Sequence, residues 1–98
     1  DIEIAKNYTL LSNHPNPFNP ETEISYMIEF NGDVQLVIYD LMGREIKTLV
    51  NEFQMEGISY SISWDGKNTN GVDVPSGIYF TRLISNNQLI TKKITLMR

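Results

Sequence analysis

The sequence predicts an all-β protein, namely an immunoglobulin-like antiparallel β-sandwich of about seven strands without a disulfide. Short segments of alternating apolar and polar residues recur along the chain and are separated by turn-forming residues. No segment shows the apolar period of an amphipathic helix. Evenly spaced short strands of this kind are typical of two antiparallel sheets packed face to face.

Length and composition limit the chain to one domain. Its 98 residues, 41% of them apolar, are enough for a single hydrophobic core, and the lack of cysteine excludes a disulfide. Residues 1–73 hold all twelve acidic residues and four basic ones, whereas residues 74–98 hold four basic residues and no acidic one. We expect the folded sheets to bring these charges together, and the alternative is that the basic segment recognises a partner. The acidic chain is a poor candidate for binding nucleic acid.

The beginning of the chain is expected to connect the domain to another part of a longer protein. The chain starts at Asp1 rather than at methionine, residues 1–7 are expected to be a linker from a preceding domain, and the folded domain is expected at residues 8–98. A short first strand or edge segment is predicted within residues 8–13, with Tyr8, Leu10 and Leu11 as its buried members.

Three of the four prolines lie in the segment Pro15, Asn16, Pro17, Phe18, Asn19, Pro20. Each proline fixes its own φ and favours an extended conformation in the residue before it, so the segment is predicted to be a rigid, non-helical lead-in. Phe18 is its only large apolar side chain and is expected to plug one end of the core. Asn16 and Asn19 are expected to cap neighbouring backbone groups.

Two strands are predicted next. Residues 22–29 alternate in polarity and predict a half-buried strand with Ile24, Tyr26 and Ile28 on one face. Asn31-Gly32 then predicts a hairpin turn, because both residues tolerate positive φ. Residues 34–40 are apolar at nearly every position, which predicts a strand that is central in its sheet or covered on both faces.

The middle of the chain predicts two further strands. Residues 41–44 are predicted to form a tight turn in which Gly43 has positive φ. The strand at 45–50 shifts its apolar spacing at Leu49, which predicts a bulge or a bend, and residues 51–56 are predicted to be a loop. Residues 58–64 alternate most regularly, with serines predicted to face outward and four large residues predicted to face inward: Ile58, Tyr60, Ile62 and Trp64.

The last third of the chain predicts a long loop and a hairpin. Residues 65–77 are rich in Gly, Asn and Asp and predict several turns. Strands at 77–84 and 89–97 are predicted to pair across residues 85–88. The second of these puts Lys92 on one face and Lys93 on the other, so one lysine must lie at an edge or extend to solvent.

The sequence offers little for catalysis or metal binding. The only histidine, His14, precedes a proline on the exposed lead-in and lacks the partners that a catalytic or metal site needs. Residues 65–77 match a calcium loop only in part, at Asn68, Asn70 and Gly71, because the first aspartate and the closing glutamate are missing. We therefore expect turn chemistry there, with no metal, cofactor or catalytic residue and no enzyme activity.

Five blocks of residues carry a family resemblance. They are Leu11 with residues 15–22; residues 34–40 with Gly43 and Arg44; residues 57–66, which end in Trp64, Asp65 and Gly66; Gly71 with residues 75–80; and residues 92–96. In order and spacing, these blocks resemble the type A C-terminal sorting domains of the type IX secretion system over about residues 8–98. The related domain of the flagellar hook-capping protein shares the later blocks.

The resemblance implies a secretion signal. Such a domain directs a larger cargo protein, attached on its N-terminal side, through the outer-membrane translocon of a Gram-negative bacterium to the cell surface or medium, after passage through the periplasm. A sortase-like peptidase commonly removes it, here in the linker before Tyr8. Membrane insertion is not expected, and self-association is left open.

The resemblance also implies residue roles. It assigns translocon recognition to Gly77, Tyr79, Lys92, Lys93, Ile94 and Leu96. It assigns the fold-defining role to Pro15, Asn16, Pro17, Phe18, Asn19, Pro20, Gly43, Trp64, Asp65 and Gly66.

Two other functions stay open. A structural immunoglobulin-like module of a surface filament, adhesin or flagellar hook cap would associate through strand edges. A carbohydrate-binding module would need exposed, coplanar aromatic rings. The aromatic residues lie at predicted strand positions, which favours packing, and Trp64 in particular is expected inside the sandwich.

Overall fold

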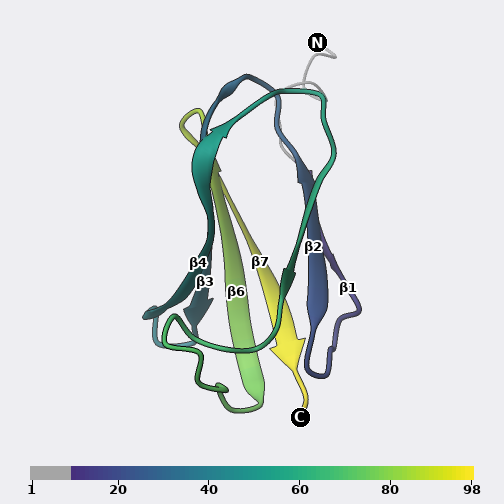
Figure 1. Cartoon of the computed structure of the whole chain (residues 1–98), viewed down its shortest axis with the longest axis vertical. Coiled ribbons are helices and arrows are strands. Elements are labelled where there is room, and N and C mark those ends of the chain that lie inside the picture. The colour runs from purple at the N-terminus through teal and green to yellow at the C-terminus, as the bar shows by residue number, and fades with distance from the viewer. Residues whose placement is uncertain (1–9) are drawn as a thin grey trace.

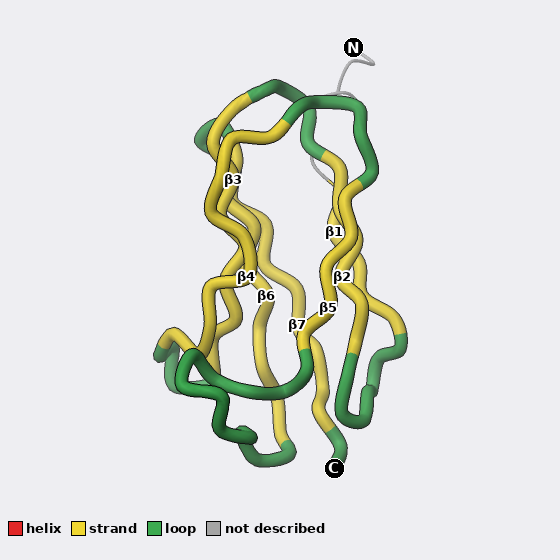
Figure 2. Tube along the Cα trace, in the orientation of Figure 1, coloured by secondary structure: helices red, strands yellow, loops and turns green. Residues whose placement is uncertain are grey.

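The computed structural model describes residues 10–98 and shows seven strands in two antiparallel sheets (Figures 1 and 2). One sheet has the order β1-β2-β5 and the other the order β4-β3-β6-β7. The strands are β1 (Leu10–His14), β2 (Thr22–Met27), β3 (Gly32–Asp40), β4 (Glu45–Gln54), β5 (Tyr60–Trp64), β6 (Gly77–Ser85) and β7 (Gln88–Leu96). The predicted all-β sandwich is confirmed. The expected linker at 1–7 and Tyr8 lie outside the described residues.

Strand β3 occupies the position that its composition predicts. It lies between β4 and β6 in the four-stranded sheet, so both of its edges are paired. Val34, Leu36 and Ile38 point into the core and are fully buried. Val37 lies on the opposite face and is also buried, which accounts for the nearly continuous apolar run.

The prediction of a hairpin at Asn31-Gly32 was wrong, because β2 and β3 belong to different sheets. The Asn31 side chain accepts a hydrogen bond from the Glu56 amide at 2.8 Å. Gly32 lies close to the Asn86 side chain, since a Cβ there would lie 2.7 Å from Oδ1 of Asn86 and the side chain would have to shift. The glycine therefore serves contacts with distant loops rather than a local turn.

Strand β4 is longer than predicted, because residues 51–54 continue the strand instead of forming a loop. They pair with the beginning of β3, and the buried side chain of Gln54 accepts a hydrogen bond from the Tyr26 hydroxyl at 2.7 Å. The bulge predicted at Leu49 is confirmed: Leu36 pairs with Val50 and the next residue of β3 with Thr48, which leaves Leu49 unpaired.

Strand β5 is shorter than predicted and begins at Tyr60. Ile58 was expected to face inward, but its side chain is 48% exposed. The chain is still crossing between the sheets at this point, as the hydrogen bond from the Gly57 amide to the Ile28 carbonyl shows. Trp64, at the other end of the strand, is fully buried as predicted.

The two tight turns of the four-stranded sheet follow ordinary turn chemistry. Gly43 has a φ of 85°, as predicted, and the Asp40 carboxylate accepts hydrogen bonds from the amides of Met42 and Arg44. The predicted hairpin between β6 and β7 is confirmed, and its two turn residues, Asn86 and Asn87, have positive φ.

Phe18 closes one end of the core, as predicted. Its ring is 2% exposed and lies 5.7 Å from that of Trp64, which in turn lies 5.5 Å from the ring of Tyr79. The remaining core residues come from both sheets: Leu11, Ile24, Tyr26, Ile28, Val34, Leu36, Ile38, Val74, Leu83, Ile94 and Leu96.

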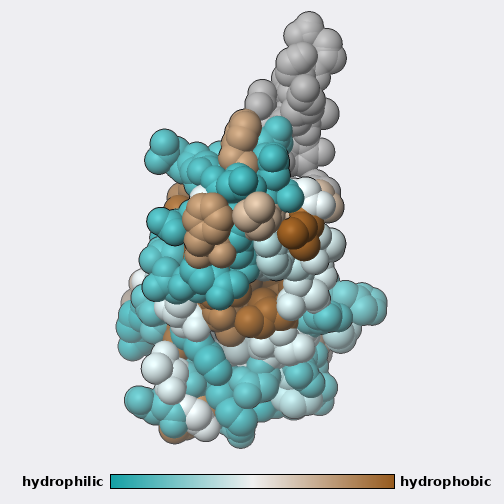
Figure 3. Space-filling view, turned by 45° about the horizontal axis from the view of Figure 1, so that its top comes forward, coloured by the Kyte–Doolittle hydropathy of each residue, from teal (hydrophilic) through white to brown (hydrophobic). Residues whose placement is uncertain are grey.

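The opposite end of the sandwich is less well covered. Apolar side chains are visible on its surface in Figure 3, and the connections β2–β3 and β4–β5 carry Phe30, Met55 and Ile58, all exposed. No helix that could cross a membrane occurs between residues 10 and 98.

We predict that Phe18→Ala lowers the free energy of unfolding by about 3–5 kcal/mol, because it removes a buried ring and leaves a cavity beside Trp64. Urea denaturation followed by tryptophan fluorescence measures this loss. The matched control is Phe30→Ala, which removes a ring that is 54% exposed and should change stability by less than about 1 kcal/mol. Equal losses in the two variants would contradict the plug role of Phe18.

Candidate recognition site

All six residues assigned to recognition lie on the β6–β7 hairpin. The antiparallel register pairs Gly77 with Leu96 and Tyr79 with Ile94, while Lys92 and Lys93 lie opposite Thr81 and Phe80. Sequence reasoning thus grouped residues that the fold brings together.

Burial divides this group in two. Tyr79, Ile94 and Leu96 are 5%, 0% and 1% exposed, so their side chains pack in the core and are not available to a partner of the folded domain. The side chains of Lys92 and Lys93 are exposed and project from opposite faces of β7. The exposed part of the predicted site is therefore a pair of cations on an edge strand.

The positive charges of Lys92 and Lys93 are not neutralised by ion pairs among residues 10–98. Three ion pairs occur among residues 10–98, and only that between Arg98 and Asp73 joins a base of the last segment to an acid of the earlier one. The expectation that folding brings the opposite charges together holds for this pair alone. Within the described part of the chain, neither Lys92 nor Lys93 has an acidic partner.

The proline segment is hydrogen-bonded to the C-terminal half of the free edge of β7. The Phe18 amide donates to the Thr95 carbonyl at 3.0 Å, and the Met97 amide donates to the Phe18 carbonyl at 2.9 Å. The Asn16 side chain accepts from the Thr95 amide and donates to the Lys93 carbonyl, which confirms its capping role. The described residues show no such bond for Asn19, whose side chain is exposed.

Pro15 helps to hold this segment from the other side. Its carbonyl accepts a hydrogen bond from the buried Thr22 hydroxyl at 2.8 Å, and the Asn13 side chain donates to the same hydroxyl oxygen. His14 is the last residue of β1 rather than part of the lead-in, and its side chain is exposed.

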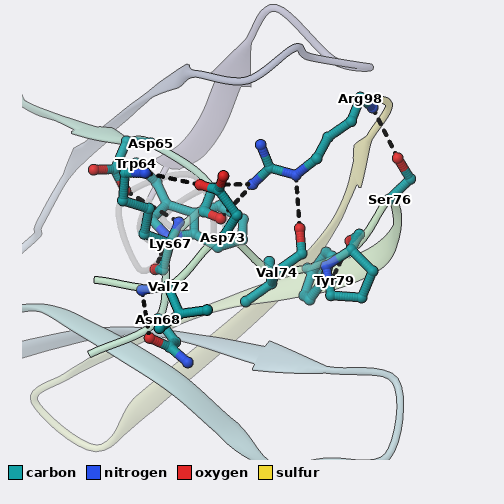
Figure 4. A network of polar contacts seen from close by, with 12 residues as sticks. Trp64, Asp65, Lys67, Asn68, Val72, Asp73, Val74, Ser76, Tyr79 and Arg98 are labelled. Atoms are coloured by element: carbon teal, nitrogen blue, oxygen red, sulfur yellow. Dashed lines mark hydrogen bonds and ion pairs between the residues drawn. The ribbon is translucent and has the colours of Figure 1, made fainter. Parts of the chain in front are cut away.

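Arg98 is a residue that sequence reasoning missed. Figure 4 shows its side chain reaching back to the loop between β5 and β6, where Nε donates to the Val74 carbonyl at 2.7 Å and Nη2 donates to the Gly66 carbonyl. Its amide donates to the Ser76 hydroxyl at 2.8 Å. No local sequence pattern could indicate these contacts, because they join segments 22 to 32 residues apart.

The β5–β6 loop uses its polar residues for turns, as predicted. The Asn68 side chain accepts hydrogen bonds from the amides of Asn70 and Val72, and the Asp65 carboxylate accepts one from the Lys67 amide. The Lys67 carbonyl accepts the indole N–H of Trp64 at 2.9 Å. The loop is therefore fixed to the core and stabilises the end of the sandwich at which Tyr79 lies.

Two ionisable groups near this loop have shifted pKa values. A hydrogen bond and the charge of Lys67, together with the charge of Arg98, lower the pKa of Asp73 below its ordinary value of 3.8. Burial, and to a lesser degree the charge of Asp40, raises the pKa of Tyr79 above its ordinary value of 10.0. The Tyr79 hydroxyl is therefore protonated at neutral pH and donates to the Pro75 carbonyl at 2.6 Å.

We predict that Gly66→Ala destabilises the domain more than Gly43→Ala. Both glycines have positive φ, so both substitutions strain the backbone by about 1 kcal/mol. At Gly66 the new Cβ would also lie 2.7 Å from the Arg98 guanidinium and 3.1 Å from the Pro20 carbonyl, whereas nothing lies within 4 Å at Gly43. Urea denaturation of both variants tests this order. Equal destabilisation would contradict this order and mean that Arg98 and Pro20 move away from the new Cβ without cost.

We predict that the stability of the domain falls on acidification below about pH 4 and that Asp73→Asn reduces this fall. A carboxylate whose folded-state pKa is lowered contributes stability above its unfolded pKa, here near 3.8, and the contribution is lost as the pH falls through the folded-state value. Chemical denaturation at pH 7 and pH 2 measures the difference. Asp33→Asn, an exposed acid outside the ion pairs of residues 10–98, is the control and should retain the full fall.

The model of the family described as "Secretion system C-terminal sorting domain" matches residues 12–97. A comparison with curated proteins gave no significant match.

Solved structures show where the same fold occurs. PorU of Porphyromonas gingivalis, solved as a latent dimer, aligns with a TM-score of 0.74 at 21% identity over 91% of this chain and 9% of its own. PorZ of the same organism, described as an essential surface component of the type IX secretion system, aligns with a TM-score of 0.63 at 18% identity over 90% of this chain and 11% of its own. The chain thus spans only about a tenth of the length of either protein.

The hook-capping protein FlgD of Xanthomonas campestris has a similar domain, with a TM-score of 0.60 at 20% identity over 90% of this chain and 66% of its own. Identities this low show a shared fold, while the family match covers most of the sequence. The chain belongs to the family of C-terminal sorting domains of the type IX secretion system.

Proposed function

We propose that this domain directs an attached cargo protein through the type IX outer-membrane translocon and that Lys92 and Lys93 are its recognition residues. Family membership supports a general role with the type IX machinery, in export to the cell surface or medium and attached to a cargo chain. The family consists of sorting signals rather than catalysts. The observation that carries the finer proposal is the exposure of both lysines without an acidic partner between residues 10 and 98.

The remaining residues of the predicted site have a supporting role in this proposal. Tyr79, Ile94 and Leu96 hold β7 against the core, and Gly77 forms the start of the hairpin at the end where β7 finishes. They fix the backbone of β7 and hence the directions in which the two lysine side chains project. The surface that Lys92 and Lys93 recognise is acidic, because two cations without acidic partners are attracted most strongly to carboxylates.

The rest of the export route follows from the same proposal. The cargo lies on the N-terminal side of the domain and passes through the periplasm before translocation. A sortase-like peptidase then removes the domain within the linker at residues 1–7.

Export of a fusion protein tests the proposal. Residues 1–98 are fused to a periplasm-targeted fluorescent protein in a type IX-competent bacterium, and the fraction at the cell surface and in the medium is measured. Deleting residues 89–98 would remove nearly all of β7, including the buried Ile94 and Leu96, so it would test folding and recognition together. The double substitution Lys92→Gln with Lys93→Gln removes only exposed charges. Arg44→Gln with Lys47→Gln removes two positive charges elsewhere and controls for net charge, although it also removes the ion pair between Arg44 and Asp40.

We expect the intact fusion and the control to be exported and the Lys92/Lys93 variant to lose at least about nine-tenths of its export, because two charge-assisted contacts are lost. Denaturation curves of the purified domains confirm that all three are folded. Full export of the Lys92/Lys93 variant would exclude the lysines as recognition residues. Retention of the folded, intact fusion in the periplasm would refute the sorting function in that host.

A further inference from the structure

The outer face of the four-stranded sheet contains a hollow of about 270 Å³. It lies where β3, β6 and β7 run side by side next to the β3–β4 turn. Its lining comes from the turn and all three strands: Tyr39, Asp40, Leu41, Gly43, Phe80, Arg82 and Thr91. This face points away from the other sheet, so the hollow is separate from the core of the sandwich.

The floor of the hollow is apolar. Tyr39 and Phe80 lie opposite each other on β3 and β6, and both are half-buried although they are on the outer face. Val37, two residues before Tyr39 on the same face, is 4% exposed. Leu41 is 66% exposed at the rim. Apolar side chains have thus gathered on a sheet face that a monomeric sandwich usually presents to water.

Arg82 is the unusual member of the lining. It follows Phe80 by two residues on β6, so both side chains project from the same face. Its guanidinium carbon lies 4.5 Å from the centre of the Tyr39 ring. Its Nε is buried and has no hydrogen-bond partner within the described part of the chain. A buried donor left unsatisfied costs free energy. The outer nitrogens of the same guanidinium also have no hydrogen-bond or ion-pair partner among residues 10–98, so they are open to an acceptor that the domain itself does not supply.

The nearby acids do not supply that acceptor. Both oxygens of the Asp40 carboxylate are engaged, one with the amides of Met42 and Arg44 and the other with the Arg44 side chain at 2.8 Å. Lys93 lies opposite Phe80 on β7 and adds a second positive charge to this side of the hollow. Glu45, opposite Tyr39 on β4, is a further acid of this face, and its carboxylate accepts a hydrogen bond from the Thr48 hydroxyl at 2.9 Å. Arg82 and Lys93 have no acidic partner among residues 10–98, so the complementary ligand is an anion.

We propose that this hollow binds an extended segment of a partner protein in which an apolar side chain and a carboxylate are two residues apart. Residues i and i+2 of an extended chain project to the same side about 7 Å apart, which matches the spacing of Phe80 and Arg82 along β6. The apolar side chain contacts Tyr39 and Phe80. The carboxylate accepts N–H groups at the outer end of the Arg82 guanidinium and is close to Lys93. The binding site uses the outer face of the sheet and shares Lys93 with the proposed recognition residues, but peptide binding to it is measured without export.

Short peptides are suitable probes for this site. The peptide acetyl-Phe-Ser-Glu-Ser-amide has the required spacing. Acetyl-Phe-Ser-Gln-Ser-amide lacks only the charge, and acetyl-Phe-Glu-Ser-Ser-amide keeps the charge but changes the spacing. Each is titrated into the ¹⁵N-labelled 98-residue chain while amide and arginine Nε–H resonances are recorded by NMR.

We expect the first peptide to shift the Nε–H resonance of Arg82 and the amides of Phe80 and Thr91. Its affinity should exceed that of either control peptide by about tenfold, because only it forms a charge-assisted hydrogen bond with Arg82. Arg82→Met keeps the length of the side chain, removes the charge and should abolish the difference between the Glu and Gln peptides. Lys92→Met, which removes a charge from the opposite face of the hairpin, should preserve it.

A second measurement guards against misfolding. Arg82→Met removes a buried unsatisfied donor, so its urea midpoint should equal or exceed that of the wild type. Equal affinities for the three peptides, or shifts confined to other faces, would overturn the proposal. Concentration-dependent self-association through this face in sedimentation experiments would also overturn it, because a second copy would then be the occupant.

Discussion

The packing of the buried Trp64 ring against Phe18 and Tyr79 is the interaction on which the rest of the structure depends. Its indole comes from β5, in the three-stranded sheet, and packs between the rings of Phe18 and Tyr79, the second of which belongs to the other sheet. Large aromatic side chains bury more apolar area than any others and so dominate core energetics. The indole N–H is satisfied by a loop carbonyl, so this burial leaves no unpaired polar group. Trp64 thereby joins both sheets, the proline segment and the β5–β6 loop at one end of the domain.

The features that sequence reasoning predicted correctly depend on local patterns. Alternation identified β2, β6 and β7, and the continuous apolar run identified β3 as a central strand. Proline rigidity and a single aromatic ring were sufficient to identify Phe18 as the plug. These predictions succeeded because strand periodicity and turn chemistry depend on neighbouring residues only.

The errors arose where a residue serves a distant contact. Gly32 was interpreted as a turn residue, but it makes room for the Asn86 side chain. Residues 51–54 were interpreted as a loop, yet Gln54 is buried because its amide oxygen accepts the Tyr26 hydroxyl. Arg98 was not assigned any role, although its side chain donates to two carbonyls of the β5–β6 loop. A sequence pattern without long-range information cannot distinguish these uses from the local ones.

The candidate site shows the same division. A family motif contains both residues that form the binding surface and residues that support it. Only the burial of each side chain distinguishes the two groups. On the β6–β7 hairpin the buried members fix the strand, and the lysines project from it. The outer face of the same hairpin, with Arg82 and Phe80, was not recognised from sequence. Whether a sheet face is solvated or apolar depends on which side chains are neighbours on adjacent strands, and the sequence of one strand does not show this.

The attachment of the proline segment to β7 has a kinetic consequence. Asn16 and Thr95, joined by a hydrogen bond, are 79 positions apart in the chain, so closing this contact requires almost the whole domain to be present and mostly ordered. Until it forms, the edge of β7 is open along its full length and can pair with any other extended chain. The species most prone to aggregation is therefore the nearly complete sandwich just before closure. High protein concentration during refolding should therefore favour pairing of this open edge with another chain, because association is bimolecular whereas closure occurs within one chain.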